Sequence, residues 1–265
     1  MSATPDIKIE IRDLTMAYGS FVVMRDISAQ IRRGEIFIIM GGSGCGKSTL
    51  LRHMIGLKQP AKGDIYYDGR PFWASDDAAR TQRLRSFGVL FQSGALWSSM
   101  TLAENIGLVL GEYTEYSPAE IRDLARLKLA LVGLKGFEDY YPAEISGGMC
   151  KRAGLARALA LDPDVLFFDE PSAGLDPISS RNLDQLILQL RDSLGATFVV
   201  VTHELASIFT IGDNSVFLDP DTRTMRAAGN PRQLRDHSTD PAVREFLTRG
   251  ESARRPAAVS TTSPT

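Results

Sequence analysis

The chain has 265 residues, of which 43% are hydrophobic, 23% charged and 8% aromatic, the usage of a globular protein with a sizeable core. Thirty basic side chains against 32 acidic ones give a net charge of −2, which argues against nucleic acid as a partner. The two cysteines lack the spacing of a disulfide framework or a zinc site. Since there is neither a signal-like amino terminus nor an apolar run of about 18 residues, we expect a soluble, cytoplasmic protein.

Two segments near the amino terminus, 7–12 and 27–31, alternate apolar and polar residues. A period of two is typical of half-exposed strands, so the first thirty-odd residues predict an antiparallel β layer. The next segment, 36–40, is an unbroken apolar run, as in a strand that is covered on both faces. After a glycine-rich loop, residues 47–55 place apolar side chains at helical spacing, and Gly56 is suited to end that helix.

Three further segments have the composition of buried strands, at 87–91, 165–168 and 197–201, and each is followed by polar residues and then by helical sequence. This alternation is typical of a parallel α/β sheet. Between the first two segments only helical patterns occur, so residues 93–150 predict an inserted helical subdomain. Two helix starts within it are predicted by capping boxes, Thr101 with Glu104 and Ser117 with Glu120.

The pattern is weaker towards the carboxyl terminus. A strand is predicted at 215–218, and Asn230 and Asp240, each followed by proline, predict the starts of two short helices. Residues 251–265 are mostly Ser, Thr, Ala, Pro and Arg, a composition that predicts disorder. We therefore expect one domain over residues 1–250, followed by a disordered tail.

The glycine-rich loop between the strand at 36–40 and the helix at 47–55 matches the phosphate-binding pattern G-x-x-x-x-G-K-[ST]. Its residues are, in order, Gly41, Gly42, Ser43, Gly44, Cys45, Gly46, Lys47, Ser48 and Thr49. Glycines let backbone amides converge on phosphate oxygens, and the helix start adds its positive dipole end. Lys47 is expected to neutralise the β and γ phosphates, and the Ser48 hydroxyl to bind Mg²⁺. The alternative is a flexible loop with a solvated lysine, which the flanking strand and helix disfavour.

Polar residues follow three of the predicted buried strands at the edge where α/β sheets place their ligands. Asp169 is suited to hold Mg²⁺, and Glu170 to polarise an attacking water molecule. Gln92 could join the Mg²⁺ shell or orient water, and His203 could contact the γ phosphate. An acidic pair, a glutamine or a histidine taken alone is more often structural. Together with the phosphate loop, these residues predict a site that binds and hydrolyses a nucleotide.

Residues 145–149, Ile-Ser-Gly-Gly-Met, precede a helix predicted at 150–161, and here the sequence resembles the ATP-binding subunits of ABC transporters. The resemblance covers roughly residues 5–235. It extends in order to the phosphate loop, Gln92, Asp169 with Glu170, the loop at 172–176, and His203. It implies an α/β P-loop NTPase fold: a RecA-like parallel sheet with an N-terminal antiparallel β layer and an inserted helical subdomain. The cofactors it implies are ATP and Mg²⁺.

The Ser-Gly-Gly segment is by itself a second helix start that could hold an anion. The family implies that two copies pair head to tail, so that Ser146, Gly147 and Gly148 of one chain cover the γ phosphate held by the other chain. Sequence geometry alone leaves open a position on the same sheet edge as the phosphate loop. The family also places Asp176 at the nucleotide and stacks Tyr18 on adenine, although Tyr18 could be an ordinary strand aromatic. A homodimer with two ATP sites is therefore implied.

The signature segment of this family usually ends in Gln, whereas this chain has Met149. With the segment 91–96 and an additional helix near 240–247, the sequence is most similar to the Mla and Mce-associated branch, which moves phospholipids or other hydrophobic molecules between bacterial membranes. The implied partners are an integral membrane permease dimer and a membrane-anchored lipid-binding protein, on the cytoplasmic face of the inner membrane. The alternatives are an importer of polar amino acids, a soluble ABC ATPase of the DNA-repair class and a regulator without hydrolysis.

Two apolar segments have uses that the sequence leaves open. Trp97 and Met100 either receive a short helix from a membrane partner or pack the helical subdomain. Val243, Phe246 and Leu247 form the apolar positions of the additional helix, which in related proteins helps to hold the ATPase dimer together.

Overall fold

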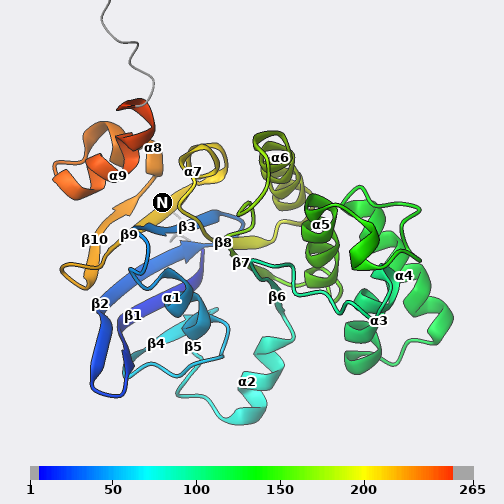
Figure 1. Ribbon diagram of the computed structural model, residues 1–265. Coiled ribbons are helices and arrows are strands. Elements are labelled where there is room, and N and C mark those ends of the chain that lie inside the picture. The colour runs from blue at the N-terminus through cyan, green and yellow to red at the C-terminus, as the bar shows by residue number, and fades with distance from the viewer. Residues whose placement is uncertain (1–5, 253–265) are drawn as a thin grey trace, which may run out of the picture.

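The computed structural model describes residues 6–252, which form two β sheets flanked by helices (Figure 1). The elements are, in chain order, β1 (Ile7–Tyr18), β2 (Phe21–Arg32), β3 (Ile36–Gly41), α1 (Lys47–Met54), β4 (Lys62–Tyr67), β5 (Arg70–Pro71), α2 (Asp77–Leu84), β6 (Phe87–Leu90), α3 (Leu102–Tyr113), α4 (Pro118–Leu131), the 3₁₀ turn η1 (Pro142–Glu144), α5 (Gly147–Ala158), β7 (Val165–Asp169), α6 (Pro177–Leu194), β8 (Thr197–Val201), α7 (Leu205–Ile211), β9 (Asn214–Asp219), β10 (Thr224–Gly229), α8 (Pro231–His237) and α9 (Pro241–Ser252).

The central sheet has the strand order β10-β9-β3-β8-β7-β6. The strands from β9 to β6 run parallel, whereas β10 is antiparallel to β9. The buried strands predicted at 36–40, 87–91, 165–168 and 197–201 are confirmed as β3, β6, β7 and β8. Because the parallel strands share one direction, their carboxyl ends meet at a single edge, and the predicted site residues follow them there.

The unbroken apolar run of β3 is explained by burial on both faces of the sheet. Ile36, Ile38 and Met40 belong to a core that the sheet shares with the helices, including α3 to α7. Phe37 and Ile39 belong to a second core on the opposite face. Strands that are covered on both sides need no polar alternation, which is why the pattern here differs from that of β1 and β2.

The predicted antiparallel layer is confirmed as a second sheet of order β2-β1-β4-β5. Its buried side chains share the second core with β3, β7 and β8. The first helix contributes Leu50, Leu51 and Met54 to the same core. The helix that follows the glycine-rich loop is therefore packed against both sheets, which fixes the direction in which its first residues point.

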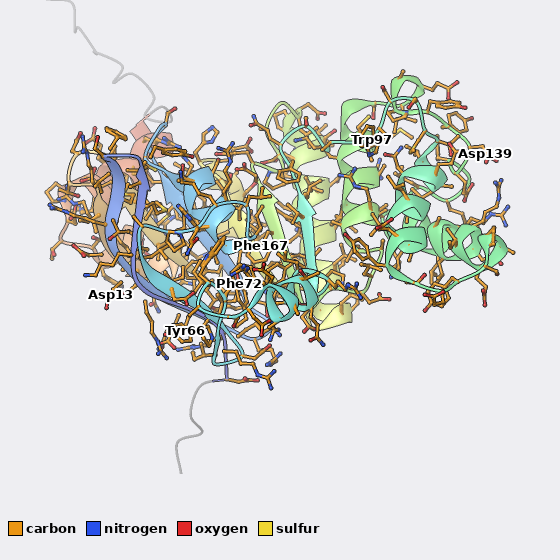
Figure 2. All side chains as sticks on the ribbon, turned by 90° about the horizontal axis from the view of Figure 1, so that it is seen from below. Asp13, Tyr66, Phe72, Trp97, Asp139 and Phe167 are labelled. Atoms are coloured by element: carbon orange, nitrogen blue, oxygen red, sulfur yellow. The ribbon has the colours of Figure 1, made fainter. Side chains whose placement is uncertain are left out.

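The helical part and the antiparallel sheet lie at opposite ends of the molecule. Figure 2 shows Trp97 and Asp139 at the helical end, Asp13 and Tyr66 at the sheet end, and Phe167 of β7 between them. Both predicted capping boxes are present, at the starts of α3 and α4. Among the residues described, no helix combines the length and the apolar character needed to cross a membrane.

Two expectations are corrected by the structure. The helix predicted at 150–161 spans Gly147–Ala158, because the Ser146 hydroxyl caps it by accepting a hydrogen bond from the Met149 amide at 3.2 Å. The tail predicted to be disordered at 251–265 begins inside a helix, since α9 continues to Ser252. The remainder of that prediction, 253–265, lies outside the described residues.

Candidate functional site

The glycine-rich loop runs from the end of β3 to the start of α1 and depends on its glycines. Gly41 has φ +152°, and a Cβ there would lie 2.4 Å from the Leu218 carbonyl oxygen and 2.6 Å from the Cys45 sulfur. Gly46, which precedes α1, has φ 95° and offers the helix no side-chain cap. The first amides of α1 therefore have no capping oxygen from Gly46, so an anion in the loop could accept their hydrogen bonds.

Lys47 bends back over this loop. Its ammonium donates hydrogen bonds to the carbonyl oxygens of Gly41 at 3.1 Å and Gly42 at 3.0 Å, and the residue is 8% exposed. These carbonyls hold the positive charge above the loop without an acidic partner. A phosphate group could therefore take the ammonium without breaking an ion pair.

The acidic residues lie beside the loop as predicted. The Ser48 hydroxyl donates to the Asp169 carboxylate at 2.9 Å. Glu170 has the left-handed φ of 48°, and its amide donates to the Val201 carbonyl of β8 at 2.9 Å. Non-glycine residues rarely adopt this backbone conformation, and those that do are concentrated at functional sites. The strained turn directs two successive carboxylates to different partners.

Those partners are separate: Asp169 contacts Ser48, whereas Glu170 contacts His203. The imidazole Nδ1 of His203 lies 2.8 and 2.9 Å from the two carboxylate oxygens of Glu170. Glu170 has only 12% of its side chain exposed, and His203 has 53%. A carboxylate that is sheltered, and held on both oxygens by one imidazole, is suited to accept a proton from a water molecule between it and the loop.

One cavity of about 490 Å³ joins these parts. It is lined by Val23, Gly41, Ser43, Gly44, Gly46, Lys47, Ser48, Thr49, Gln92, Glu170, His203 and Arg249. The structure thus brings most of the predicted loop together with Gln92, Glu170 and His203. Asp169 lines an adjoining hollow that it shares with Gln92.

The donors that could hold a metal are few and are all oxygen atoms. Among the described residues there is no cluster of three or more His, Cys, Asp and Glu side chains that could bind a metal ion. Ser48 and Asp169 nevertheless present a hydroxyl and a carboxylate 2.9 Å apart, beside the loop. Mg²⁺ prefers such oxygens and usually takes its other ligands from water and phosphate, so this small set fits it.

Some predicted residues lie beside the cavity rather than in its lining. Cys45 is buried with its thiol against the loop, and burial raises the pKa of that thiol. Tyr18 lies next to α1, where bonds to Thr49 and Arg52 lower the pKa of its phenol. The Lys58 ammonium lies 3.2 Å from the centre of the Tyr18 ring, so a base stacked on this face would have to displace it.

Four predicted residues form a separate group away from this cavity. Ser146, Gly147 and Gly148 start α5, which Figure 1 shows beyond β7 and β6, on the side away from α1. Asp176 caps α6 and accepts hydrogen bonds from the amides of Ile178 and Ser179 and from the Ser179 hydroxyl, which lower its pKa. Within one chain, none of these four residues lines the phosphate-loop cavity.

Two basic residues at the site have no equivalent in the sequence predictions. Lys151 of α5 is almost fully buried and donates to the backbone carbonyl of Gln92, and burial lowers its pKa. It ties the start of α5 to the segment that follows β6. Arg249 of α9 enters the cavity lining from the far end of the chain. Arg249 belongs to no motif, and although Lys151 follows the signature segment, only the tertiary structure shows its contact with Gln92.

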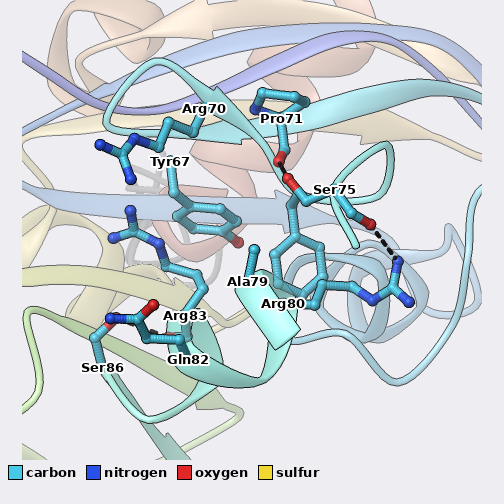
Figure 3. A pocket seen from close by; sticks show the side chains of 10 residues that line it. Tyr67, Arg70, Pro71, Ser75, Ala79, Arg80, Gln82, Arg83 and Ser86 are labelled. Carbon is cyan, nitrogen blue, oxygen red and sulfur yellow. Dashed lines mark hydrogen bonds between the residues drawn. The ribbon is translucent and has the colours of Figure 1, made fainter. Parts of the chain in front are cut away.

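A second hollow, of about 260 Å³, lies between the β4–β5 hairpin and α2 (Figure 3). Three arginines line it, but two of them already have acceptors. Arg80 donates to the carbonyls of Trp73 and Ser75, and Arg83 donates to the Asp68 carboxylate. The phosphate-loop cavity, with its unopposed lysine and convergent amides, is therefore the better anion site.

Comparisons with known proteins agree with this geometry. The family description "ABC transporter" matches residues 24–173. The chain is 43% identical over 242 residues to the probable ribonucleotide transport ATP-binding protein mkl of Mycobacterium tuberculosis, covering 91% of this chain and 66% of that protein. It is 38% identical over 239 residues to the intermembrane phospholipid transport system ATP-binding protein MlaF of Escherichia coli K12, covering 90% and 88%. The chain thus spans just under two thirds of the length of the mkl protein of Mycobacterium tuberculosis.

Solved structures show the same fold. The ATP-binding cassette MJ0796, a dimer bound to ADP and Pi in a post-hydrolysis state, matches with a TM-score of 0.75 and 30% identity, over 83% of this chain and 97% of that one. The cbiO1 protein of Clostridium perfringens, part of the cbiONQ transporter complex, matches with a TM-score of 0.80 and 26% identity, over 94% and 96%. The predicted α/β P-loop fold is confirmed.

Proposed function

Because the chain belongs to the ABC transporter family of ATP-binding domains, we propose that it binds MgATP at the phosphate loop and hydrolyses it to drive a membrane transporter. The observation that carries this proposal is the single cavity that Lys47, Glu170 and His203 share. A loop that only stored a nucleotide would not need a sheltered carboxylate held by a histidine. The proposed chemistry is the transfer of the γ phosphoryl group to water.

The phosphate loop supplies charge and orientation. Lys47 exchanges its two carbonyl contacts for β and γ phosphate oxygens, while the loop amides and the start of α1 hold the remaining oxygens. Ser48 and Asp169 would hold Mg²⁺, and Gln92, which follows β6 and lines the same cavity, would join them. When bound, the metal neutralises charge that develops on the phosphate oxygens.

Glu170 and His203 act on the attacking water. Glu170 accepts a proton from the water as the bond to phosphorus forms, and His203 holds both of its carboxylate oxygens in place. The side chain of His203 is 53% exposed and lines the same cavity as the phosphate loop, which supports a contact with the γ phosphate. Most of the rate enhancement comes from this positioning and from charge stabilisation, as is general in phosphoryl transfer.

The second helix start requires a second chain. Ser146, Gly147 and Gly148 do not line the cavity of their own chain, so they are free to cover the γ phosphate of a partner. Asp176 lies on the neighbouring helix start and belongs to the same surface. A head-to-tail homodimer therefore contains two complete ATP sites. The dimeric form of the MJ0796 cassette supports this arrangement.

The cargo that we propose is a phospholipid or another hydrophobic molecule, carried by an integral membrane permease dimer on whose cytoplasmic side the ATPase sits. The MlaF relatives support this, since their similarity extends over nearly their whole length. Trp97 is 58% exposed and Phe91 37%, so this segment is available to a permease helix and Trp97 does not pack the helical core. A membrane-anchored lipid-binding protein completes the proposed system.

The name of the mkl relatives favours a second cargo, ribonucleotides, and the sequence left polar amino acids open. The cargo is decided by reconstitution of the ATPase with the permease that co-purifies with it. In vesicles that carry a fluorescent phospholipid, movement of the lipid that depends on ATP supports the proposal. ATP-dependent uptake of a labelled ribonucleotide or amino acid, with the phospholipid unmoved, would replace it.

Hydrolysis itself is tested by Glu170→Gln, which keeps the shape of the side chain and removes the base. ATP binding should be retained, whereas turnover should fall by about 10² to 10⁴-fold, the usual contribution of a general base. Glu115→Gln, at an exposed glutamate of the helical part, is the matched control and should turn over like the unmodified chain. Unchanged phosphate release in the Glu170 variant would remove that residue from its role.

A further inference from the structure

Arg249 lines the cavity from the last described helix, whereas the other lining residues come from β2, from the phosphate loop and the start of α1, and from the segments that follow strands of the central sheet. It belongs to α9, and it lines the cavity together with the phosphate loop, Glu170 and His203. It is separated from His203 by 46 positions in the chain. The question is therefore which contacts hold this basic side chain of the last described helix at the phosphate site.

The helix that carries Arg249 is firmly packed. Val243 and Leu247 are at most 1% exposed, and the Phe246 ring lies 5.2 Å from the ring of Phe217 on β9. At the start of α9, Asp240 accepts a hydrogen bond from the Ala242 amide at 2.9 Å. Asp240 also pairs with Arg226 of β10 at 2.8 Å. These contacts attach α9 to the central sheet.

The position of Arg249 follows from this packing. Phe246 lies three positions earlier, on the same face of the helix, and the Arg249 guanidinium stacks 4.3 Å from the centre of its ring. From this support, the guanidinium donates a hydrogen bond to the backbone carbonyl of His203. His203 lies between β8 and α7, and its imidazole holds both carboxylate oxygens of Glu170.

We propose that Arg249 is a positioning residue for hydrolysis: by binding the carbonyl of His203 it fixes the backbone from which the imidazole reaches Glu170. A charge-assisted hydrogen bond from a stacked guanidinium is strong enough to select one backbone geometry. In this way the docking of α9 on the sheet is connected to the rate of the chemical step. The inference rests on the proposed ATP hydrolysis and adds a residue that no motif of the phosphate site contains.

The first test separates positioning from direct binding of phosphate. With the full chain as a dimer, Arg249→Ala should lower kcat for ATP hydrolysis by about tenfold, the loss expected for one charge-assisted hydrogen bond, and should change KM less than twofold. Arg249→Lys, which keeps a cation able to donate to a carbonyl, should recover part of kcat. Arg244→Ala, at an exposed position of the same helix, is the matched control and should change neither constant.

The second test asks whether Arg249 acts through His203. In the His203→Ala background, Arg249→Ala should cause no further loss, because the imidazole that it positions is already absent. Full additivity of the two substitutions would overturn the proposal. So would an unchanged kcat in Arg249→Ala, or a rise in KM for ATP with kcat unchanged, which would show a direct contact with phosphate.

Two controls keep the outcome interpretable. Thermal unfolding of Arg249→Ala should stay close to that of Arg244→Ala, so that a fall in kcat is not ascribed to loss of α9. If Arg249→Ala unfolds α9, the Arg249→Lys variant decides the test. A folded Arg249→Lys variant whose kcat is as low as that of Arg249→Ala would contradict the proposal. If the unmodified chain releases no phosphate, the proposed function fails, whereas normal hydrolysis in every Arg249 variant defeats only this inference.

Discussion

The chain contains two glycine-rich helix starts, at α1 and at α5, and their surroundings differ. At α1 the chain brings together a lysine, a hydroxyl with a carboxylate beside it, and a second carboxylate held by a histidine. At α5 the only cap is the Ser146 hydroxyl, and the neighbouring side chains belong to the start of α6. In the proposed function, the first helix start binds the nucleotide and the second covers it from another chain.

The glycines at the two helix starts differ in the space around them. A Cβ at Gly41 would collide with the backbone of β9, so the folded chain itself requires glycine there. At Gly147 an added Cβ would meet no atom of the described residues within 4 Å, and at Gly148 the nearest atom, of Ser179, would be 3.8 Å away. Glycine also weakens a helix, so the folded chain itself gives no reason for glycine at these two positions, as the proposed approach of a second chain would.

The largest effect that separates the two helix starts is expected for Lys47→Ala. Loss of the ammonium should weaken ATP binding by about 10- to 100-fold, since a hydrogen bond to a charged group is worth roughly 1.5–3 kcal/mol. Ser146→Ala should leave ATP binding to the dilute, monomeric chain within about twofold of normal, although loss of the α5 cap costs about 1 kcal/mol of stability. Titration with a fluorescent ATP analogue measures both.

An equal loss of monomer binding in the two variants would contradict the comparison, because it would place both helix starts on the same nucleotide. Lys58→Ala serves as the control for a nearby surface cation. It removes the ammonium that lies over Tyr18 but leaves the loop intact, so binding should not weaken.

Gly148→Ala is expected to have a smaller effect, which raises stability and lowers hydrolysis. The alanine fits the folded chain and favours the helix, so the free energy of unfolding should rise by up to about 1 kcal/mol. Hydrolysis by the dimer should fall about tenfold or more, because the methyl group would hinder the approach of the partner's γ phosphate. Thermal unfolding and phosphate release together measure the two effects. A stabilised variant with full hydrolysis would show that α5 does not cover a phosphate.

The sequence predicts the residues of the phosphate-loop site better than it predicts the helices that support them. The loop, Asp169, Glu170 and His203 follow strands whose apolar runs are unmistakable, and parallel strands must bring their ends together. The sequence pattern predicts the start of α5 three residues late, because glycines disfavour a helix, and the Ser146 cap fixes the start at Gly147. Arg249 could not be predicted, because its contact with His203 depends on how α9 packs on β9.

Other elements have sequence patterns that are too weak to predict them. The strands β4, β5 and β10 and the helix α2 have no predicted counterpart, and α6 and α7 are predicted only as helical sequence without bounds after the strands at 165–168 and 197–201. The short β5 contains only Arg70 and Pro71, which form a strand solely because β4 pairs with them. The start of α6 at Pro177 is capped by Asp176, but that aspartate was interpreted through the family motif rather than as a helix cap.

The smallest effect concerns Asp184, which lies where α6 packs on α7. Burial raises the pKa of Asp184 from 3.8 to about 6, although the Ser207 hydroxyl donates to it at 2.9 Å. Above pH 6 the folded chain must keep a buried charge that the unfolded chain holds at no cost. As the pH falls below 6 the folded state takes up a proton before the unfolded state does, so this penalty is lost.

Asp184→Asn keeps an acceptor for Ser207 and removes the charge. At pH 7.5 it should raise the free energy of unfolding by about 1–2 kcal/mol, and the gain should shrink towards zero as the pH approaches 4. Thermal unfolding across this pH range measures the effect, with the exposed Asp192→Asn on the same helix as the control. ATP hydrolysis should be unchanged, because Asp184 touches neither helix start. A gain that persists at pH 4 would assign the effect to packing rather than to charge, and altered hydrolysis would show that α6 and α7 transmit between the two sites.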